Sequence, residues 1–171
     1  MKKVYLLTGK PGTGKTSLIK RLVADMRADA GGFYTEEIRD GGLRQGFKLV
    51  TLDGEEALLA HTSIRGQNRV SKYGVDTDAL DRVGVAALSR ALSERRMVVI
   101  DEIGKMELLS AAFRDIVSDI IGSGLKVVGT IMSNPNPWAD DIKHRPQVKL
   151  ITVTRDNHPQ ILKELSTWLK S

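Results

Sequence analysis

The chain has 171 residues, of which 41% are hydrophobic and 27% charged, a size and balance typical of one soluble globular domain. It contains no cysteine, which excludes disulfides, thiolate zinc sites and thiol nucleophiles, so a bound metal would have oxygen ligands. The net charge of +5 comes from cations scattered among acidic residues, which disfavours a nucleic-acid partner. The first apolar run, residues 4–7, is too short for a signal peptide or a membrane span, and we expect a cytoplasmic protein without membrane association.

The amino-terminal third of the chain predicts a strand, a helix and a hairpin. An apolar run at residues 4–8 predicts the strand. A helix should follow over residues 15 to about 29, because apolar side chains recur on one face: Leu18, Ile19, Leu22, Val23 and Met26. Two strand-like segments flanked by glycine pairs, residues 33–39 and 46–52, then indicate a hairpin with its turn near Asp40.

The middle of the chain predicts a loop, a helix and a buried strand. Residues 53–75 are polar, contain glycine and show no clear period, so we expect a long loop there. A helix should begin after Asp76, its N-cap, with these apolar positions on one face: Leu80, Val83, Ala87, Leu88, Ala91 and Leu92. Residues 97–100 are apolar throughout, as in a strand buried on both faces, and Asp101 follows at its carboxyl end.

The carboxyl-terminal part continues this alternation of strands and helices. A strongly periodic helix should run from Leu108 to Ile121 and end at the glycines that follow. The remaining predicted elements are a strand at 126–132, a short helix at 138–144, a strand at 148–153 and a helix at 159–169. The pattern predicts one α/β domain over residues 1–171, with a mostly parallel central sheet covered by helices on both faces. In such sheets ligands bind beyond the carboxyl ends of the strands.

Residues 9–16 match the phosphate-loop pattern G-x-x-x-x-G-K-[ST], directly after a predicted strand and before a predicted helix. Glycines let the backbone curl so that its N–H groups face phosphate oxygens, and the helix N-terminus adds its positive dipole end. We expect Lys15 to reach the β- and γ-phosphates of a nucleoside triphosphate and the Thr16 hydroxyl to ligate Mg²⁺. The nucleotide-binding residues predicted by this pattern are Gly9, Lys10, Pro11, Gly12, Thr13, Gly14, Lys15 and Thr16.

Acidic residues follow the buried strand at 97–100. Asp101, at the strand end, is predicted to bind the same Mg²⁺ ion as the phosphate loop. Glu102 is predicted to orient or deprotonate the attacking water, and with Lys15 it is a candidate catalytic residue. Glu107 is a rival for that task, although a carboxylate in the first turn of a helix is also explained by the helix dipole.

Arg145 is a further catalytic candidate. It lies between two predicted strands, and a γ-phosphate transition state needs additional positive charge, so Arg145 could act as an internal arginine finger. The alternative is a surface arginine in the sequence Lys143-His144-Arg145.

Two further segments make the chain resemble a known family. Residues 101–108 read DEIGKMEL and residues 32–36 read GFYTE, and with the phosphate loop they resemble the THEP1 family of nucleoside triphosphatases over nearly the whole chain. The resemblance implies a P-loop protein with a RecA-like sheet that hydrolyses ATP, GTP and other nucleoside triphosphates with Mg²⁺. It also implies a second nucleotide motif at Val99, Ile100, Asp101, Glu102, Ile103, Gly104, Lys105 and Met106.

Asn157-His158 departs from the family pattern, which more often has Asn-Arg there, so a base or ribose contact from His158 stays open. Asn157 could instead cap the last helix, with Gln160 three residues further on. Thr35, Glu36 and Arg39 lie where an ordered loop could sense the γ-phosphate, but the alternating face of a strand explains them more simply.

Two alternatives to hydrolysis stay open. The same loop and sheet could deliver the phosphoryl group to another acceptor, as in a small nucleotide or nucleoside kinase, with residues 53–75 holding a lid. Hydrolysis could also time the binding of a macromolecular partner, whose identity the sequence does not reveal. The sequence has no clean base-reading motif such as N-K-x-D, so we expect weak discrimination between ATP and GTP.

Overall fold

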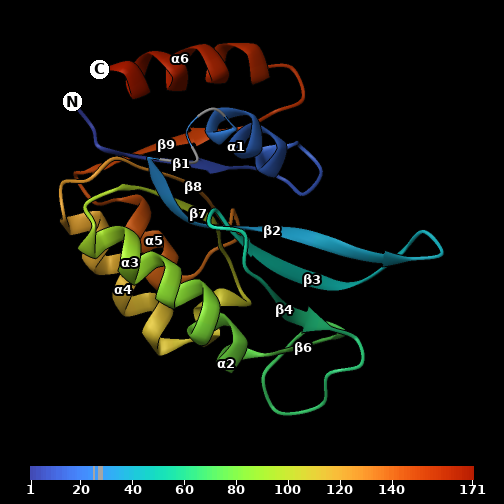
Figure 1. The fold of residues 1–171 in the computed structure, drawn as a ribbon. Helices are drawn as coiled ribbons and strands as arrows, with labels where there is room; N and C mark the ends of the chain where they lie inside the picture. The colour runs from blue at the N-terminus through green and yellow to red at the C-terminus, as the bar shows by residue number, and fades with distance from the viewer. Residues whose placement is uncertain (25, 27–28) are drawn as a thin grey trace.

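A computed structural model describes residues 1–24, 26 and 29–171, whose strands form one nine-stranded sheet (Figure 1). The strand order is β5-β6-β4-β3-β2-β7-β8-β1-β9. The strands are β1 (Val4–Thr8), β2 (Ala30–Asp40), β3 (Leu43–Thr51), β4 (Glu56–His61), β5 (Arg69–Val70), β6 (Tyr73–Val75), β7 (Met97–Ile103), β8 (Val127–Ile131) and β9 (Val148–Thr152). The helices are α1 (Lys15–Val23), α2 (Thr77–Ala79), the π-helical η1 (Leu80–Val85), α3 (Ala86–Ser93), the 3₁₀ helix η2 (Glu107–Leu109), α4 (Ala111–Gly122), α5 (Pro137–Lys143) and α6 (His158–Lys170).

The strands β2, β7, β8, β1 and β9 run parallel and form one half of the sheet. Every residue of β1 and β8 is buried, which explains why apolar residues predominate in both strands. Helices α1 and α6 cover one face of this half, and α3, α4 and α5 cover the other (Figure 1). The predicted α/β fold with a mostly parallel, two-faced sheet is therefore confirmed. No helix in the described part of the chain is long and apolar enough to cross a membrane.

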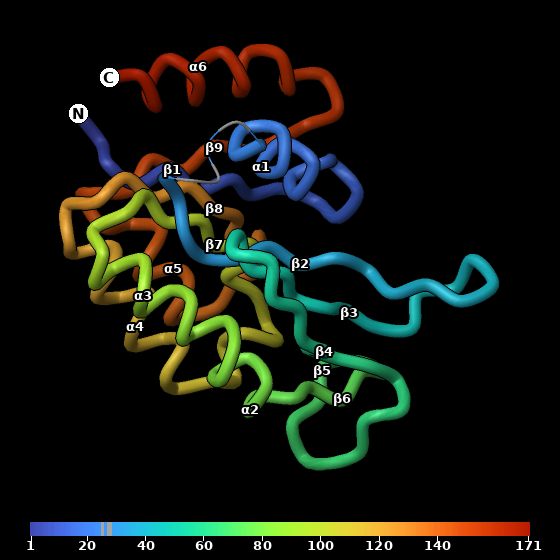
Figure 2. The backbone as a smooth tube through the Cα atoms, in the orientation of Figure 1, coloured from blue at the N-terminus to red at the C-terminus, as the bar shows by residue number. Residues whose placement is uncertain are grey.

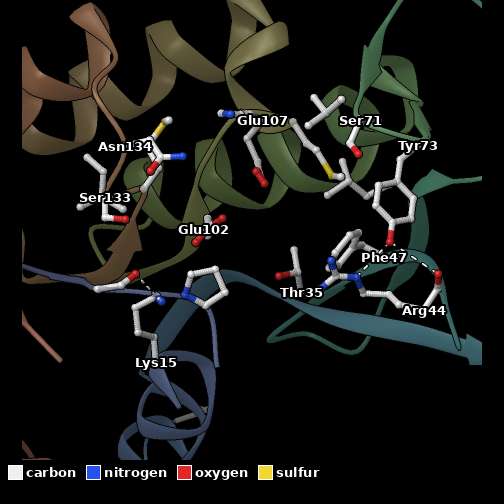
Figure 3. A pocket seen from close by; sticks show the side chains of 18 residues that line it. Lys15, Thr35, Arg44, Phe47, Ser71, Tyr73, Glu102, Glu107, Ser133 and Asn134 are labelled. Carbon is white, nitrogen blue, oxygen red and sulfur yellow. Dashed lines mark hydrogen bonds between the residues drawn. The ribbon is translucent and has the colours of Figure 1, made fainter. Parts of the chain in front are cut away.

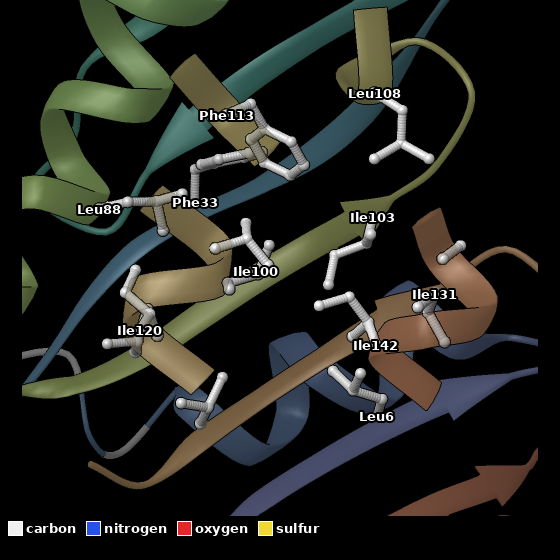
Figure 4. Close-up of a cluster of buried hydrophobic side chains, with 14 of the residues drawn as sticks. Leu6, Phe33, Leu88, Ile100, Ile103, Leu108, Phe113, Ile120, Ile131 and Ile142 are labelled. Carbon is white, nitrogen blue, oxygen red and sulfur yellow. The ribbon is translucent and has the colours of Figure 1, made fainter. Parts of the chain in front are cut away.

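Hydrophobic side chains pack on both faces of the parallel strands. On one face, Phe33 of β2 and Phe113 of α4 lie with ring centroids 6.3 Å apart, in a cluster that includes Ile100 of β7 (Figure 4). On the other face, the Trp168 ring of α6 lies 4.4 Å from the Tyr5 ring of β1. Because both faces are covered, the strand ends that carry the predicted site are held on a rigid support.

The other half of the sheet is antiparallel. β2 and β3 form the predicted hairpin, which turns at Gly41 and Gly42 and extends away from the helices (Figure 2). The prediction of a long loop over residues 53–75 is wrong, because β4, β5 and β6 lie there. A shift of register in the pairing of β3 with β4 accompanies two consecutive buried residues, Leu59 and Ala60, so β4 lacks the alternation that marks a half-buried strand.

The ends of two helices differ from their predictions. α1 ends at Val23 rather than near Asp29, and residues 25, 27 and 28 of the predicted helix lie outside the described residues. Asn157 stands at the N-cap position of α6, but its side chain makes no capping hydrogen bond. Instead it bridges the turn after β9, accepting from the Thr154 N–H and donating to the Thr152 carbonyl, each at 2.8 Å. The predicted N-cap Asp76 does accept from the Ala79 N–H, at 2.9 Å.

Candidate active site

The phosphate loop joins β1 to α1 at the carboxyl edge of the parallel strands. Gly9 and Gly14 have φ angles of 144° and 85°, which side-chain-bearing residues rarely adopt. A Cβ on Gly9 would lie 2.7 Å from the Val153 carbonyl oxygen, and a Cβ on Gly14 would lie 2.6 Å from the His158 ring. Both glycines are therefore required by the close approach of the chain after β9, as well as by the curl of the loop.

The Lys15 ammonium holds the phosphate loop together. Its Nζ donates to the carbonyl oxygens of Gly9 and Lys10, each at 2.9 Å, and the Thr13 hydroxyl also donates to Lys10 at 2.9 Å. The first turn of α1 contains no acidic residue, so its own side chains do not neutralise the positive end of the helix dipole. The Lys15 ammonium and the N-terminus of α1 both carry positive charge, so together they can bind an anion such as a phosphate group.

Asp101 is buried on β7 beside β8. Its Oδ1 accepts a hydrogen bond from the Thr130 hydroxyl at 2.5 Å, whereas its buried Oδ2 has no hydrogen-bond partner among the described residues. Burial raises the pKa of the Asp101 carboxyl, and the nearby hydroxyls of Thr130 and Thr16 and the Lys15 charge oppose that rise. Thr16 and Asp101 line one hollow of about 550 Å³ beside the phosphate loop. A buried carboxylate oxygen such as Asp101 Oδ2, without a hydrogen-bond partner among the described residues, is a suitable ligand for a hard cation.

Glu102 and Glu107 line a second cavity that adjoins this hollow (Figure 3). Burial raises the pKa of Glu102, the charge of Asp101 adds to the rise, and the charge of Lys15 opposes it. Burial raises the pKa of Glu107 well above its usual range, and the charges of Glu102 and Asp101 raise it further. Both carboxyl groups therefore resist ionisation, and the Glu107 side chain is the more deeply buried of the two.

The second cavity has a volume of about 470 Å³ and reaches from the phosphate site to the antiparallel half of the sheet (Figure 3). The two hollows are continuous, because they share the lining residues Pro11, Lys15, Thr35, Phe47 and Glu102. The far wall is formed by Arg44, Leu59, Val70, Ser71 and Tyr73. Sequence reasoning missed most of this wall because its strands were predicted as a loop. The signal available in the sequence was the presence of apolar residues, such as Leu59 and Val70, within the mainly polar residues 53–75.

The second nucleotide motif reaches the site only through its carboxyl-terminal part. Three of its side chains are fully buried in the core and are not brought to the site: Val99, Ile100 and Ile103. Glu102, Lys105 and Met106 line the cavity. Gly104 leaves room for the Glu102 side chain, since a Cβ there would lie 2.5 Å from Glu102 Oε1. The Asp101–Glu102 peptide bond is cis, where the pairing of β7 with β8 shifts register.

Thr35 and Glu36 differ in their relation to the site. Thr35 lines both hollows, as a γ-phosphate sensor would. Glu36 is paired with Lys20 at 2.8 Å and with Lys48 at 3.6 Å, and the hydrogen bond from Lys20 lowers its pKa. Both residues therefore line the hollow beside the phosphate loop, and Glu36 is in addition part of an ion-pair network across α1, β2 and β3.

Arg145 lies at the opposite edge of the sheet from the phosphate loop. It precedes β9, whose first residue Val148 pairs with Val4 at the start of β1, whereas the phosphate loop follows the end of β1. Its guanidinium donates to Asp141 Oδ2 at 3.2 Å and to the Ser118 hydroxyl at 3.0 Å. The structure does not bring Arg145 to the site, so we correct the arginine-finger interpretation to a surface arginine with two local partners.

His158, left unassigned by sequence reasoning, fastens α6 to the phosphate loop. Its Nε2 lies 2.5 Å from the Thr13 carbonyl oxygen, which can only accept, so this ring nitrogen carries the proton and donates. The ring also occupies the space beside Gly14. The departure from the Asn-Arg pattern at Asn157-His158 was the signal that could have drawn attention to this contact.

Comparisons with known proteins agree with this geometry. A family model described as NTPase matches residues 4–166. The chain is 46% identical over 165 residues to the nucleoside-triphosphatase THEP1 of Thermotoga maritima, covering 96% of this chain and 94% of that protein. It is 39% identical over 163 residues to THEP1 of Methanocaldococcus jannaschii, covering 93% and 92%. The crystal structure of THEP1 from Aquifex aeolicus matches with a TM-score of 0.91 at 34% identity, over 98% of this chain and 99% of that chain. The chain therefore belongs to the THEP1 family of nucleoside-triphosphatases.

Proposed function

We propose that this protein hydrolyses nucleoside triphosphates, ATP and GTP among them, to the diphosphate and phosphate with the help of Mg²⁺. The observation that carries the proposal is one hollow lined by Lys15, at the start of α1, and by Glu102. A γ-phosphoryl group in that hollow would have a cation and a proton acceptor for water beside it. The relatives in Thermotoga maritima and Methanocaldococcus jannaschii are named nucleoside-triphosphatases, which supports the same class of reaction.

Thr16 and Asp101 have the chemistry to hold Mg²⁺. Asp101 Oδ2 is a buried acceptor without a partner among the described residues, and Thr16 lines the same hollow. The Thr130 hydroxyl fixes the orientation of the Asp101 carboxyl through Oδ1. When bound there, Mg²⁺ would neutralise charge on the β- and γ-phosphate oxygens.

Glu102 is the residue that we assign to the attacking water. The water oxygen bonds to the γ-phosphorus, the bond from that phosphorus to the β–γ bridging oxygen breaks, and a water proton passes to the Glu102 carboxylate. Glu107 suits this task less well, because it lines only the outer cavity, whereas Glu102 also lines the hollow that contains Lys15 and Thr16. Lys15, which donates to two loop carbonyls, can turn its donors to the phosphate oxygens instead.

Weak discrimination among bases is part of the proposal. The hollow beside the phosphate loop is lined by residues suited to phosphate groups and their cation, such as Gly12, Lys15 and Thr16. A nucleotide held mainly through its phosphates is bound with little regard to the edge atoms of its base.

A phosphate-release panel tests this function. The wild type, a Lys15→Ala variant and a Lys170→Ala control, which removes an exposed lysine at the end of α6, would each receive ATP, GTP, CTP or UTP with Mg²⁺ or with excess chelator. We expect release from all four nucleotides only with Mg²⁺, and a loss of at least about 10²-fold in kcat/KM for Lys15→Ala alone.

Each part of the proposal has its own contrary outcome. Full activity in chelator would contradict the role of Mg²⁺. A preference for one base above about 100-fold in kcat/KM, about 2.7 kcal/mol, would contradict weak discrimination. Absence of phosphate release from every nucleotide would contradict hydrolysis itself.

A further inference from the structure

The cavity between the phosphate site and the antiparallel strands is larger than an attacking water requires. Its volume of about 470 Å³ lies within the range of roughly 300–1,000 Å³ that is common for small-molecule sites. A water molecule takes only roughly 30 Å³ in the liquid, so an attacking water would leave most of the cavity unused. The cavity opens onto the phosphate site at Lys15, Thr35 and Glu102, which line both hollows.

One side of the cavity is aromatic and the other is polar. Phe47 and Tyr73 meet edge to face with their ring centroids 5.4 Å apart, and Val70 extends this apolar wall. Glu102, Glu107 and Asn134 lie on the other side (Figure 3). A planar ring suits the first surface, and hydroxyl groups suit the second.

The cavity is lined by charges of both signs, with Lys15 and Lys105 as well as Glu102, so neither sign of charge is favoured in an occupant. Arg44 is already engaged, since its guanidinium donates to the Tyr73 hydroxyl at 3.0 Å and to Glu37 at 3.1 Å. A carboxylate at Glu102 disfavours an anion. Glu107 is 4% exposed, and its Oε2 has no hydrogen-bond partner in the described part of the chain. A buried oxygen of this kind calls for a ligand that can donate to it.

We propose that this cavity binds an uncharged, ring-bearing alcohol of nucleoside size, and that the enzyme transfers the γ-phosphoryl group to its hydroxyl in place of water. The hydroxyl oxygen bonds to the γ-phosphorus, the bond from that phosphorus to the β–γ bridging oxygen breaks, and the nucleoside diphosphate leaves. The hydroxyl proton passes to the Glu102 carboxylate. This inference rests on the nucleotide site and the role of Glu102 proposed above, and it adds a second substrate to them.

The test uses the full chain with ATP, Mg²⁺ and one nucleoside at a time: adenosine, guanosine, cytidine, uridine or thymidine. ADP, free phosphate and nucleoside monophosphate are quantified by chromatography. Hydrolysis alone yields equal amounts of ADP and phosphate, whereas transfer yields ADP in excess of phosphate, matched by monophosphate. We expect that excess with at least one nucleoside.

Two tryptophan variants separate the cavity from the phosphate site. Val70→Trp fills the cavity from β5, at a position that does not line the hollow beside the phosphate loop, and Leu58→Trp replaces a side chain of β4 that is 40% exposed. We expect Val70→Trp to lower monophosphate formation by at least about tenfold while phosphate release without nucleoside stays within about twofold. Leu58→Trp should change neither reaction. Phosphate release also reports that each variant is folded.

Equal ADP and phosphate with every nucleoside, from an enzyme that still releases phosphate, would overturn the transfer inference and leave hydrolysis standing. Monophosphate formation that survives in Val70→Trp would overturn the assignment to this cavity. An enzyme that releases no phosphate and forms no monophosphate would instead refute the proposed function, and this inference with it.

Discussion

Replacement of Glu102 and Glu107 by glutamine should separate proton acceptance from the other roles of a carboxyl group. Glu102→Gln keeps the shape of the side chain but removes the proton acceptor, so we expect kcat to fall by about 10²–10⁴, equivalent to about 2.7–5.5 kcal/mol. Glu107→Gln exchanges a carboxyl whose pKa is raised by burial for an uncharged amide that can both donate and accept hydrogen bonds. We therefore expect a change in kcat below about threefold, or about 0.7 kcal/mol.

Single-turnover hydrolysis with excess enzyme measures the chemical step, and equilibrium binding of the same nucleotide measures affinity. Glu94→Gln, at the end of α3 and away from both hollows, is the matched control. We expect all three variants to bind nucleotide with affinities within about threefold of the wild type. A large loss of the chemical step in Glu107→Gln with normal turnover in Glu102→Gln would refute the assignment of the proton acceptor.

Three further predictions concern the metal, the far edge of the sheet and stability. Thr16→Ala combined with Asp101→Asn should raise the Mg²⁺ concentration for half-maximal activity at least about tenfold, and an unchanged Mg²⁺ titration would exclude these ligands. Arg145→Ala should leave kcat within about twofold and cost no more than about 1 kcal/mol in urea unfolding, whereas a tenfold loss of kcat would restore the arginine finger. Since the folded pKa of Glu107 is raised, its favourable contribution is full below the unfolded pKa of about 4.3 and is lost as pH rises through the folded value. The free energy of unfolding in urea should therefore fall for the wild type, relative to Glu107→Gln, as the pH rises above about 4.3. Free energies that change in parallel with pH in the two proteins would contradict the raised pKa of Glu107.

The phosphate loop could be predicted because its geometry depends on residues close together in the chain. Gly9 and Gly14 need backbone angles that few other residues adopt, and β1 and α1 flank them directly. The parallel half of the sheet could be predicted for a similar reason, since fully buried strands such as β8 consist mainly of apolar residues. The placement of Asp101 at the same edge then follows from the topology.

The cavity wall and the position of Arg145 depend on distant pairings that no local pattern records. β4 is held by a bulged register with β3, and Tyr73 reaches the cavity because β6 pairs with β4. Arg145 was placed near the phosphates only because it lies in a loop. Its true position follows from the register of β9 on β1. The contact of His158 with Thr13 likewise joins residues 145 positions apart.

β2 belongs to both halves of the sheet, because Ala30 to Phe33 pair with β7 and Phe33 to Asp40 pair with β3. The phosphate-binding residues and most of the far wall of the cavity therefore lie on separate segments of the chain, which β2 joins. Substitutions at the far-wall positions Val70 and Ser71 could therefore change what the cavity accepts while the phosphate loop and Asp101 stay in place. Such a division gives mutation, natural or designed, a route to new partners through side chains that do not line the phosphate hollow.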